Sequence, residues 1–157
     1  MPKPRKPPKP SPAAGRAVDG AADASAQQHS RKLMVDLNSA IDLESFWKAC
    51  LQLIELHLPH RSCSLMFNIV GLKPTSAKHH VVQSRDPEYE PPTSLTISGP
   101  FLERHPQIKL YTYSQIASED PDADRRRLAQ EPQPEWNDFI HLAFWQGGRP
   151  DAVLSIH

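Results

Sequence analysis

The sequence contains only two cysteines, Cys50 and Cys63, which is too few for a disulfide framework. Such sparing use of cysteine is typical of a reduced compartment. The chain also has no run of about 18 apolar residues that could span a bilayer. No apolar core of the required length follows the basic N-terminus to form an export signal. We therefore expect a cytoplasmic protein with no membrane contact.

Motifs for catalysis are missing as well. The sequence has no glycine-rich phosphate loop and no nucleophile elbow. Cys50 and Cys63 lie on apolar stripes of a predicted helix and a predicted strand, which indicates buried, inert thiols. A redox enzyme would need an exposed thiolate with a low pKa. We predict no enzymatic activity, no catalytic residues and no cofactor.

Potential metal ligands are present, but their pattern is incomplete. His57, His60 and Cys63 are spaced three residues apart, and the pair His79–His80 adds two imidazoles. Pro59 separates the first two ligands, and no carboxylate or second cysteine completes a recognisable set. We predict structural or solvent-facing histidines and no metal site.

Charge is distributed unevenly along the chain, although the formal net charge is zero. Residues 1–32 hold seven Lys or Arg and two Asp, a net +5, whereas residues 33–157 hold eleven Lys or Arg and sixteen Asp or Glu, a net −5. The first twelve residues include six prolines, and residues 13–30 have one valine as their only large apolar residue. We predict a disordered, basic, Pro-rich tail over residues 1–29. The acidic body argues against a nucleic-acid-binding domain.

Helical periodicity begins at Ser30 and predicts two consecutive helices, over about 30–40 and 43–57. Asp42 is the predicted N-cap of the second helix. Ile41 and Phe46 occupy the positions that form a hydrophobic staple across such a cap.

The rest of the chain alternates between strand patterns and turn residues. Residues 61–70 alternate as a strand, with Cys63, Leu65, Phe67 and Ile69 on one apolar face. The sequence ends just past a predicted closing hairpin, so we expect the front part of a longer sensory protein. The remaining predicted elements are strands at 79–83, 94–98 and 109–113, a Pro-rich loop at 84–93, a short helix at 100–105, a helix from Ser118 to about 131 capped by Asp120, and hairpin strands at 137–145 and 152–156.

Three consecutive arginines, Arg125, Arg126 and Arg127, fall in that last predicted helix. They indicate either an anion or partner site, or a solvated face offset by neighbouring acidic residues.

Five stretches suggest a family: LNSAIDLESFW, LPHRSCSLMF, GPFLERHPQIKLYTYSQI, RRRLAQEP and WNDFIHLAFW. Over about residues 33–157 they resemble the amino-terminal GAF-like domain of a group of bacterial LuxR-type transcription regulators. The resemblance implies an α+β fold with a mainly antiparallel central sheet, two leading helices on one face, and short helices and loops on the other. In those regulators a final helix and a DNA-reading helix-turn-helix follow the last strand. We therefore expect a GAF-like domain over residues 30–157 with its carboxy-terminal helix missing, and no direct DNA binding by this chain.

A ligand pocket in such a fold lies against one sheet face, under the middle loops. Pockets are mostly apolar with a few oriented polar groups, so residues on mixed strand faces are the candidates. The alternative is an ordinary core in which aromatic rings are buried and their polar tips are satisfied. The candidate ligand-binding residues are Met66, Asn68, Tyr111, Tyr113, His141 and Trp145.

The leading hypothesis is a sensory or dimerising regulatory domain with a small-molecule ligand and a homodimer interface over residues 30–58. The alternative is a thiol-dependent redox enzyme or a standalone small-molecule-binding protein. A third hypothesis is an adaptor that binds a partner through the basic tail.

Overall fold

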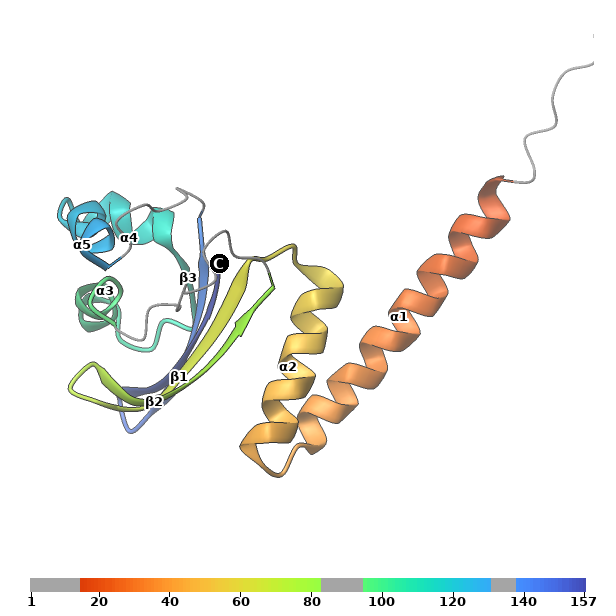
Figure 1. The fold of residues 1–157 in the computed structure, drawn as a ribbon, viewed down its shortest axis with the longest axis horizontal. Coiled ribbons are helices and arrows are strands. Elements are labelled where there is room, and N and C mark those ends of the chain that lie inside the picture. The colour runs from red at the N-terminus through yellow and green to blue at the C-terminus, as the bar shows by residue number, and fades with distance from the viewer. Residues whose placement is uncertain (1–14, 83–94, 131–137) are drawn as a thin grey trace, which may run out of the picture. The chain divides into compact units, whose positions relative to one another are not determined.

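The computed structural model of the protein describes residues 15–82, 95–130 and 138–157. Two helices come first, followed by a five-stranded antiparallel sheet with short helices, so the predicted α+β class is confirmed (Figure 1). The chain divides into two compact units, Met1–His57 and Leu58–His157.

The first unit contains α1 (Gly15–Ser39) and α2 (Leu43–His57). The second helix is where it was predicted, but α1 begins fifteen residues earlier than expected and overlaps the predicted disordered tail over residues 15–29. That segment is rich in alanine and glutamine, which are strong helix formers, and extending an existing helix costs little once it is nucleated. Residues 1–14 of the predicted tail lie outside the described residues.

Asp42 caps α2 as predicted. Its Oδ1 accepts a hydrogen bond from the Ser45 backbone N–H at 2.8 Å, and its Oδ2 accepts one from the Ser45 hydroxyl at 2.9 Å. These bonds lower the pKa of Asp42. The predicted staple between Ile41 and Phe46 is wrong, because Ile41 is 97% exposed. The side-chain cap alone therefore fixes the start of the helix.

The second unit is built on one sheet in the order β2-β1-β5-β4-β3, in which all neighbours are antiparallel. Two short turns close the hairpins, at Gly71–Leu72 and at Gly147–Gly148. All four turn residues have positive φ, the conformation that two-residue hairpin turns favour. The strands are β1 (Ser62–Val70), β2 (Lys73–Val81), β3 (Leu110–Thr112), β4 (Ile140–Gln146) and β5 (Arg149–Ile156).

Two strand predictions differ from the structure. Residues 96–98 form a turn where a strand was predicted over 94–98, and Leu95 and Ile97 both belong to one buried cluster. Strand β2 begins at Lys73, where a turn was predicted, and extends to Val81. The predicted loop 84–93 lies outside the described residues.

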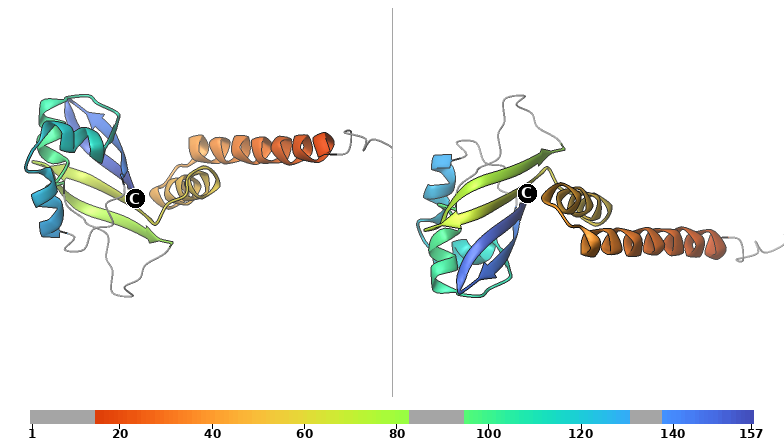
Figure 2. Two further views of the ribbon diagram at one scale, coloured as in Figure 1. Left: turned by 90° about the horizontal axis from the view of Figure 1, so that it is seen from above. Right: turned by 90° about the horizontal axis from the view of Figure 1, so that it is seen from below.

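Three short helices cover one face of the sheet: α3 (Gly99–Arg104), α4 (Tyr113–Glu119) and α5 (Ala123–Gln130) (Figures 1 and 2). The first matches its prediction closely. The helix predicted from Ser118 begins only at Ala123, and α4 starts at Tyr113, where no helix was predicted; Asp120 ends α4 instead of capping the next helix. Thr112 and Gln115 form a capping box that starts α4 directly after β3.

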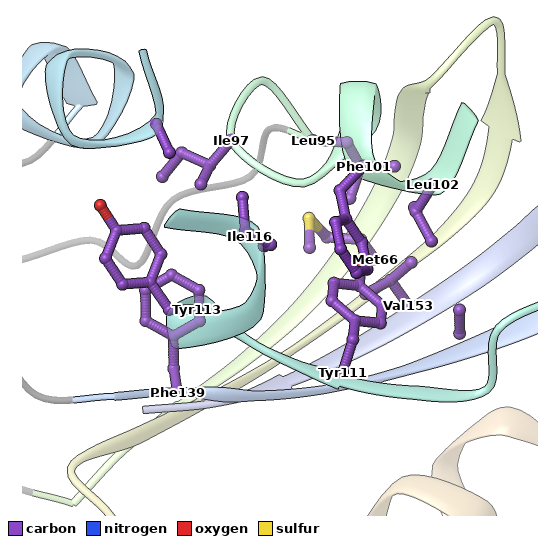
Figure 3. Close-up of a cluster of buried hydrophobic side chains, with 12 residues drawn as sticks. Met66, Leu95, Ile97, Phe101, Leu102, Tyr111, Tyr113, Ile116, Phe139 and Val153 are labelled. Carbon is purple, nitrogen blue, oxygen red and sulfur yellow. The ribbon is translucent and has the colours of Figure 1, made fainter. Parts of the chain in front are cut away.

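The core of this unit lies between the short helices and the sheet (Figure 3). Ile69 also packs against this core, although it was predicted on the opposite face. The reason is Asn68, whose left-handed backbone (φ 55°) interrupts the strand alternation. The buried cluster consists of Met66, Leu95, Ile97, Phe101, Leu102, Tyr111, Tyr113, Ile116, Ala123, Phe139, Ala143 and Val153.

Candidate functional site

One rung of polar side chains crosses all five strands on the face that the short helices cover. The cross-strand pairs run from His79 to Ser64, from Ser64 to Ser155, from Ser155 to His141 and from His141 to Tyr111. Hydrogen bonds join Ser64 Oγ to His79 Nδ1 at 2.9 Å and Ser155 Oγ to His141 Nδ1 at 2.7 Å. The rings of Tyr111 and His141 are stacked, with 4.8 Å between centroids. We call these five residues the polar rung.

Two atoms of the polar rung are buried and have no hydrogen-bond partner among the described residues: His141 Nε2 and the Tyr111 hydroxyl. Burial lowers the pKa of His141 to about 3, and the nearby charge of His157 adds to this effect. Burial raises the pKa of Tyr111 to about 12. The Ser98 hydroxyl is close enough to lower this pKa slightly, although it does not form a hydrogen bond of normal geometry with Tyr111. Both side chains are therefore neutral near pH 7.

A buried cation lies beside the rung. Arg127 is 3% exposed, and its guanidinium carbon is 4.4 Å from the Tyr113 ring centroid and 4.8 Å from that of Phe139. The Tyr113 hydroxyl donates a short hydrogen bond to Asp124. Burial, with the charge of Arg127, lowers the pKa of His157 to about 4. The guanidinium is thus held against two aromatic faces, where a cation is stabilised by the ring electrons.

The three consecutive arginines have three different environments. Arg125 is exposed and pairs with Asp122 at 3.2 Å. Arg126 binds the Asp120 carboxylate at 2.5 Å, and this bond is the main cause of the lowered pKa of Asp120. Arg127 is the buried cation described above. The solvated face that the sequence suggested therefore describes Arg125, but not Arg127.

A pocket of about 240 Å³ lies at the end of the sheet where the two glycine-containing turns meet the end of α3. Its wall is largely apolar, and two residues of opposite charge, Glu103 and Arg149, also line it. This volume is slightly below the roughly 300–1,000 Å³ of typical small-molecule sites, so the pocket would take a small ligand. The apolar lining residues are Ile69, Leu72, Leu102, Pro106, Trp145 and Pro150.

Two interactions hold the pocket wall in place. Trp145 Nε1 donates a hydrogen bond of 2.6 Å to the backbone carbonyl of Ile108, which fixes the indole ring. Leu72 has a left-handed backbone (φ 61°), and a Cβ on Gly99 would lie only 3.2 Å from its Cδ1. Glycine at position 99 therefore allows the Leu72 side chain to pack on the start of α3.

The structure separates the six predicted ligand-binding residues. Met66, Tyr111 and Tyr113 belong to the buried core cluster, although Tyr113 starts α4 and does not share a strand with Tyr111. His141 belongs to the polar rung, and Trp145 lines the pocket. Asn68 is exposed, and its Nδ2 donates to the Ser76 hydroxyl at 3.4 Å.

Sequence reasoning flagged the run Arg125–Arg127 without singling out Arg127, and it missed Glu103 and Arg149. Ala123 and Arg127 are four residues apart, which places them on one helix face, and the structure buries both. No local pattern links the other two, which are brought to one pocket by the packing of α3 against the sheet turns.

The described ranges contain no group of three or more His, Cys, Asp or Glu that could hold a metal ion. Cys50 and Cys63 are buried and lie in different compact units, and burial raises the pKa of the Cys50 thiol. Within the same ranges, no helix is both long and apolar enough to cross a membrane.

No protein-family model matches the chain, and no curated protein matches it. The arrangement of the described residues is therefore the basis on which a function is proposed.

Proposed function

We propose that this chain is the sensory, regulatory part of a transcription regulator, with a GAF-like body that binds a small molecule in the pocket beside Trp145. The order of elements supports the GAF-like assignment. Two helices lead, a strand pair follows, short helices occupy the middle, and a hairpin closes the sheet. That is the arrangement expected from the five stretches that resemble regulators of this type.

The pocket is the observation that carries the proposal. It combines a fixed apolar wall with two charged residues, Glu103 and Arg149, whose side chains have no ion pair or hydrogen bond in the described part of the chain. An apolar pocket with a few polar groups is the usual form of a small-molecule site.

Two hydroxyl–imidazole pairs in the polar rung have the residue types of a nucleophile and its base. Ser64 and Ser155, however, are 0% and 1% exposed, so a substrate cannot reach either oxygen. A nucleophile needs an accessible position beside its substrate. These pairs therefore favour a structural role over a hydrolytic one.

The helix pair supports a dimerising role. Met34 and Val35 on α1 are 48% and 65% exposed, and Ile41 between the helices is 97% exposed. Apolar side chains that gather on a surface mark interaction sites. We place the homodimer interface over residues 30–58, and a ligand would act by binding one state of that dimer more tightly than the other.

The alternative, a thiol-dependent redox enzyme, has less support because both thiols are buried. Measuring reductase activity of the wild type and of the variants Cys50→Ser and Cys63→Ser discriminates between the two functions, because a thiol-dependent enzyme has an activity that the variants lose, whereas a regulatory domain has none. A standalone binder would show ligand binding without any change in oligomeric state.

The pocket is tested by thermal unfolding of the full chain against a panel of small metabolites. A ligand at about ten times its Kd adds about 1.4 kcal/mol of stability and should raise the Tm by about 5 °C. Ile69→Phe fills the pocket and should abolish the rise, whereas Val70→Phe, at a 68% exposed position outside the pocket, should not. Circular dichroism confirms that both variants fold.

Sedimentation velocity with and without the stabilising compound tests the regulatory part. A change in the monomer–dimer balance is expected. A chain that stays monomeric at high concentration, and that no compound stabilises, would refute the proposed function.

A further inference from the structure

Glu103 and Arg149 are two residues of opposite charge that line one pocket. Glu103 lies near the end of α3 and Arg149 at the start of β5, and both are exposed where they line the same pocket. Within the described residues neither side chain has an ion pair or a hydrogen bond. By contrast, the nearby His105 binds Glu119 at 2.6 Å. Two unpaired charges of opposite sign therefore border one small cavity.

The interior of the pocket offers no free polar side chain. Ile69, Leu72 and Leu102 are aliphatic, and the only donor of Trp145 is already bonded to the Ile108 carbonyl. A polar group placed against this wall would lose its hydrogen bonds to water without replacement, which is costly. The inner part of a ligand must therefore be apolar, and the pocket volume requires it to be small.

From these two observations we infer that the ligand is a free α-amino acid with an aliphatic or aromatic side chain. Its carboxylate would bind the Arg149 guanidinium, which suits planar, two-point contact with a carboxylate. Its ammonium would bind the Glu103 carboxylate, and its side chain would lie against Trp145. This inference rests on the proposed function, because it names the ligand class of the same pocket.

The ligand class is tested by isothermal titration calorimetry of the full chain with L-leucine and L-phenylalanine. Two compounds each lack one charged group of leucine: 4-methylpentanoate lacks the amine, and 3-methylbutylamine lacks the carboxylate. Because a hydrogen bond to a charged group contributes about 1.5–3 kcal/mol, each truncated compound should bind at least about tenfold more weakly than leucine.

Charge-neutralising variants assign each end of the ligand. Arg149→Gln should weaken leucine binding about tenfold and leave 3-methylbutylamine unchanged. Glu103→Gln should weaken leucine equally and leave 4-methylpentanoate unchanged. Arg125→Gln is the matched control, because Arg125 is exposed and does not line the pocket. All three changes are at exposed positions, so the fold should be retained.

The outcomes separate this inference from the proposed function. Binding of a neutral or singly charged compound that Ile69→Phe abolishes, without amino-acid binding, would overturn the ligand class and leave the pocket's role intact. Amino-acid binding that neither Glu103→Gln nor Arg149→Gln weakens would also overturn it. Failure of every compound, amino acids included, would overturn both.

Discussion

Replacing His141 should remove part of this protein's sensitivity to acid. The imidazole is 5% exposed and lies against the rings of Tyr111 and Phe139, with 4.8 and 4.7 Å between centroids. Its pKa is lowered from 6.5 to about 3 by burial first and by the charge of His157 second. As the pH falls, His141 is therefore protonated near pH 6.5 in the unfolded chain but only near pH 3 in the folded protein.

This difference in proton binding sets the direction and the size of the change in stability with pH. The stability that His141 contributes is fully present above pH 6.5 and is lost as the pH falls from 6.5 toward about 3. Across that interval the free energy of unfolding falls by about 1.4 kcal/mol for each pH unit. Between about pH 7.5 and about pH 4.5 the loss is about 2.7 kcal/mol, a large part of the roughly 5–15 kcal/mol of a typical domain.

Urea unfolding at these two pH values, followed by tryptophan fluorescence, measures the loss. Asp120 and Asp138 have lowered pKa values and also destabilise the protein in acid, so the comparison is made between variants in the same buffers. His141→Gln should lose about 2.7 kcal/mol less than the wild type. His29→Gln, at an exposed histidine, should match the wild type. An equal loss in His141→Gln and wild type would refute the reasoning.

Three further outcomes are expected. Thr112→Ala removes the capping box of α4 and should cost about 1 kcal/mol in urea titrations, whereas Thr112→Ser should retain most of the stability. Arg127→Lys loses the planar contact with two rings and should lower the free energy of unfolding by about 1–2 kcal/mol. The exposed Arg125→Lys should stay within about 0.5 kcal/mol of the wild type. Equal losses in the two variants would contradict a stabilising contact between Arg127 and the rings. Iodoacetamide should label Cys50 and Cys63 only in urea, and rapid labelling in buffer would contradict their burial.

Features decided within a few residues were predictable from the sequence. Asp42 marks the start of α2 because its carboxylate bonds a backbone N–H three residues away. Gly147 and Gly148 mark the closing turn because positive φ suits glycine. The short helix between Gly99 and Pro106 follows from the same local logic. Caps, turns and breakers act locally, so one sequence is enough to read them.

Features decided by packing were not predictable in the same way. The apolar pattern of residues 94–98 suited a strand equally well, and only the shared core of Leu95 and Ile97 makes it a turn. Tyr113 has strand composition, yet the capping box at Thr112 makes it the first residue of a helix. The extra length of α1 comes from helix propensity that the sparse apolar content concealed.

In the candidate site, too, local features could be predicted from the sequence and features set by packing could not. Mixed strand faces pointed to Trp145, which lines the pocket, because strand periodicity sets which side chains share a face. The charges of Glu103 and Arg149 converge only through the tertiary fold, so no spacing rule could pair them. The sequence does not distinguish Arg127 from its neighbours Arg125 and Arg126, although Arg127 is buried.

The polar rung also fixes how the strands can slide past one another. Side chains alternate faces along a strand, so a slip of one residue would move Ser64 or Ser155 to the far side of the sheet. His141 would then lose its hydroxyl partner inside the protein, and the exposed His79 would lose its bond to Ser64, a penalty that a wholly aliphatic row would not impose. The rung therefore favours one strand register, because misregistered sheets would lose hydrogen bonds that the correct sheet keeps.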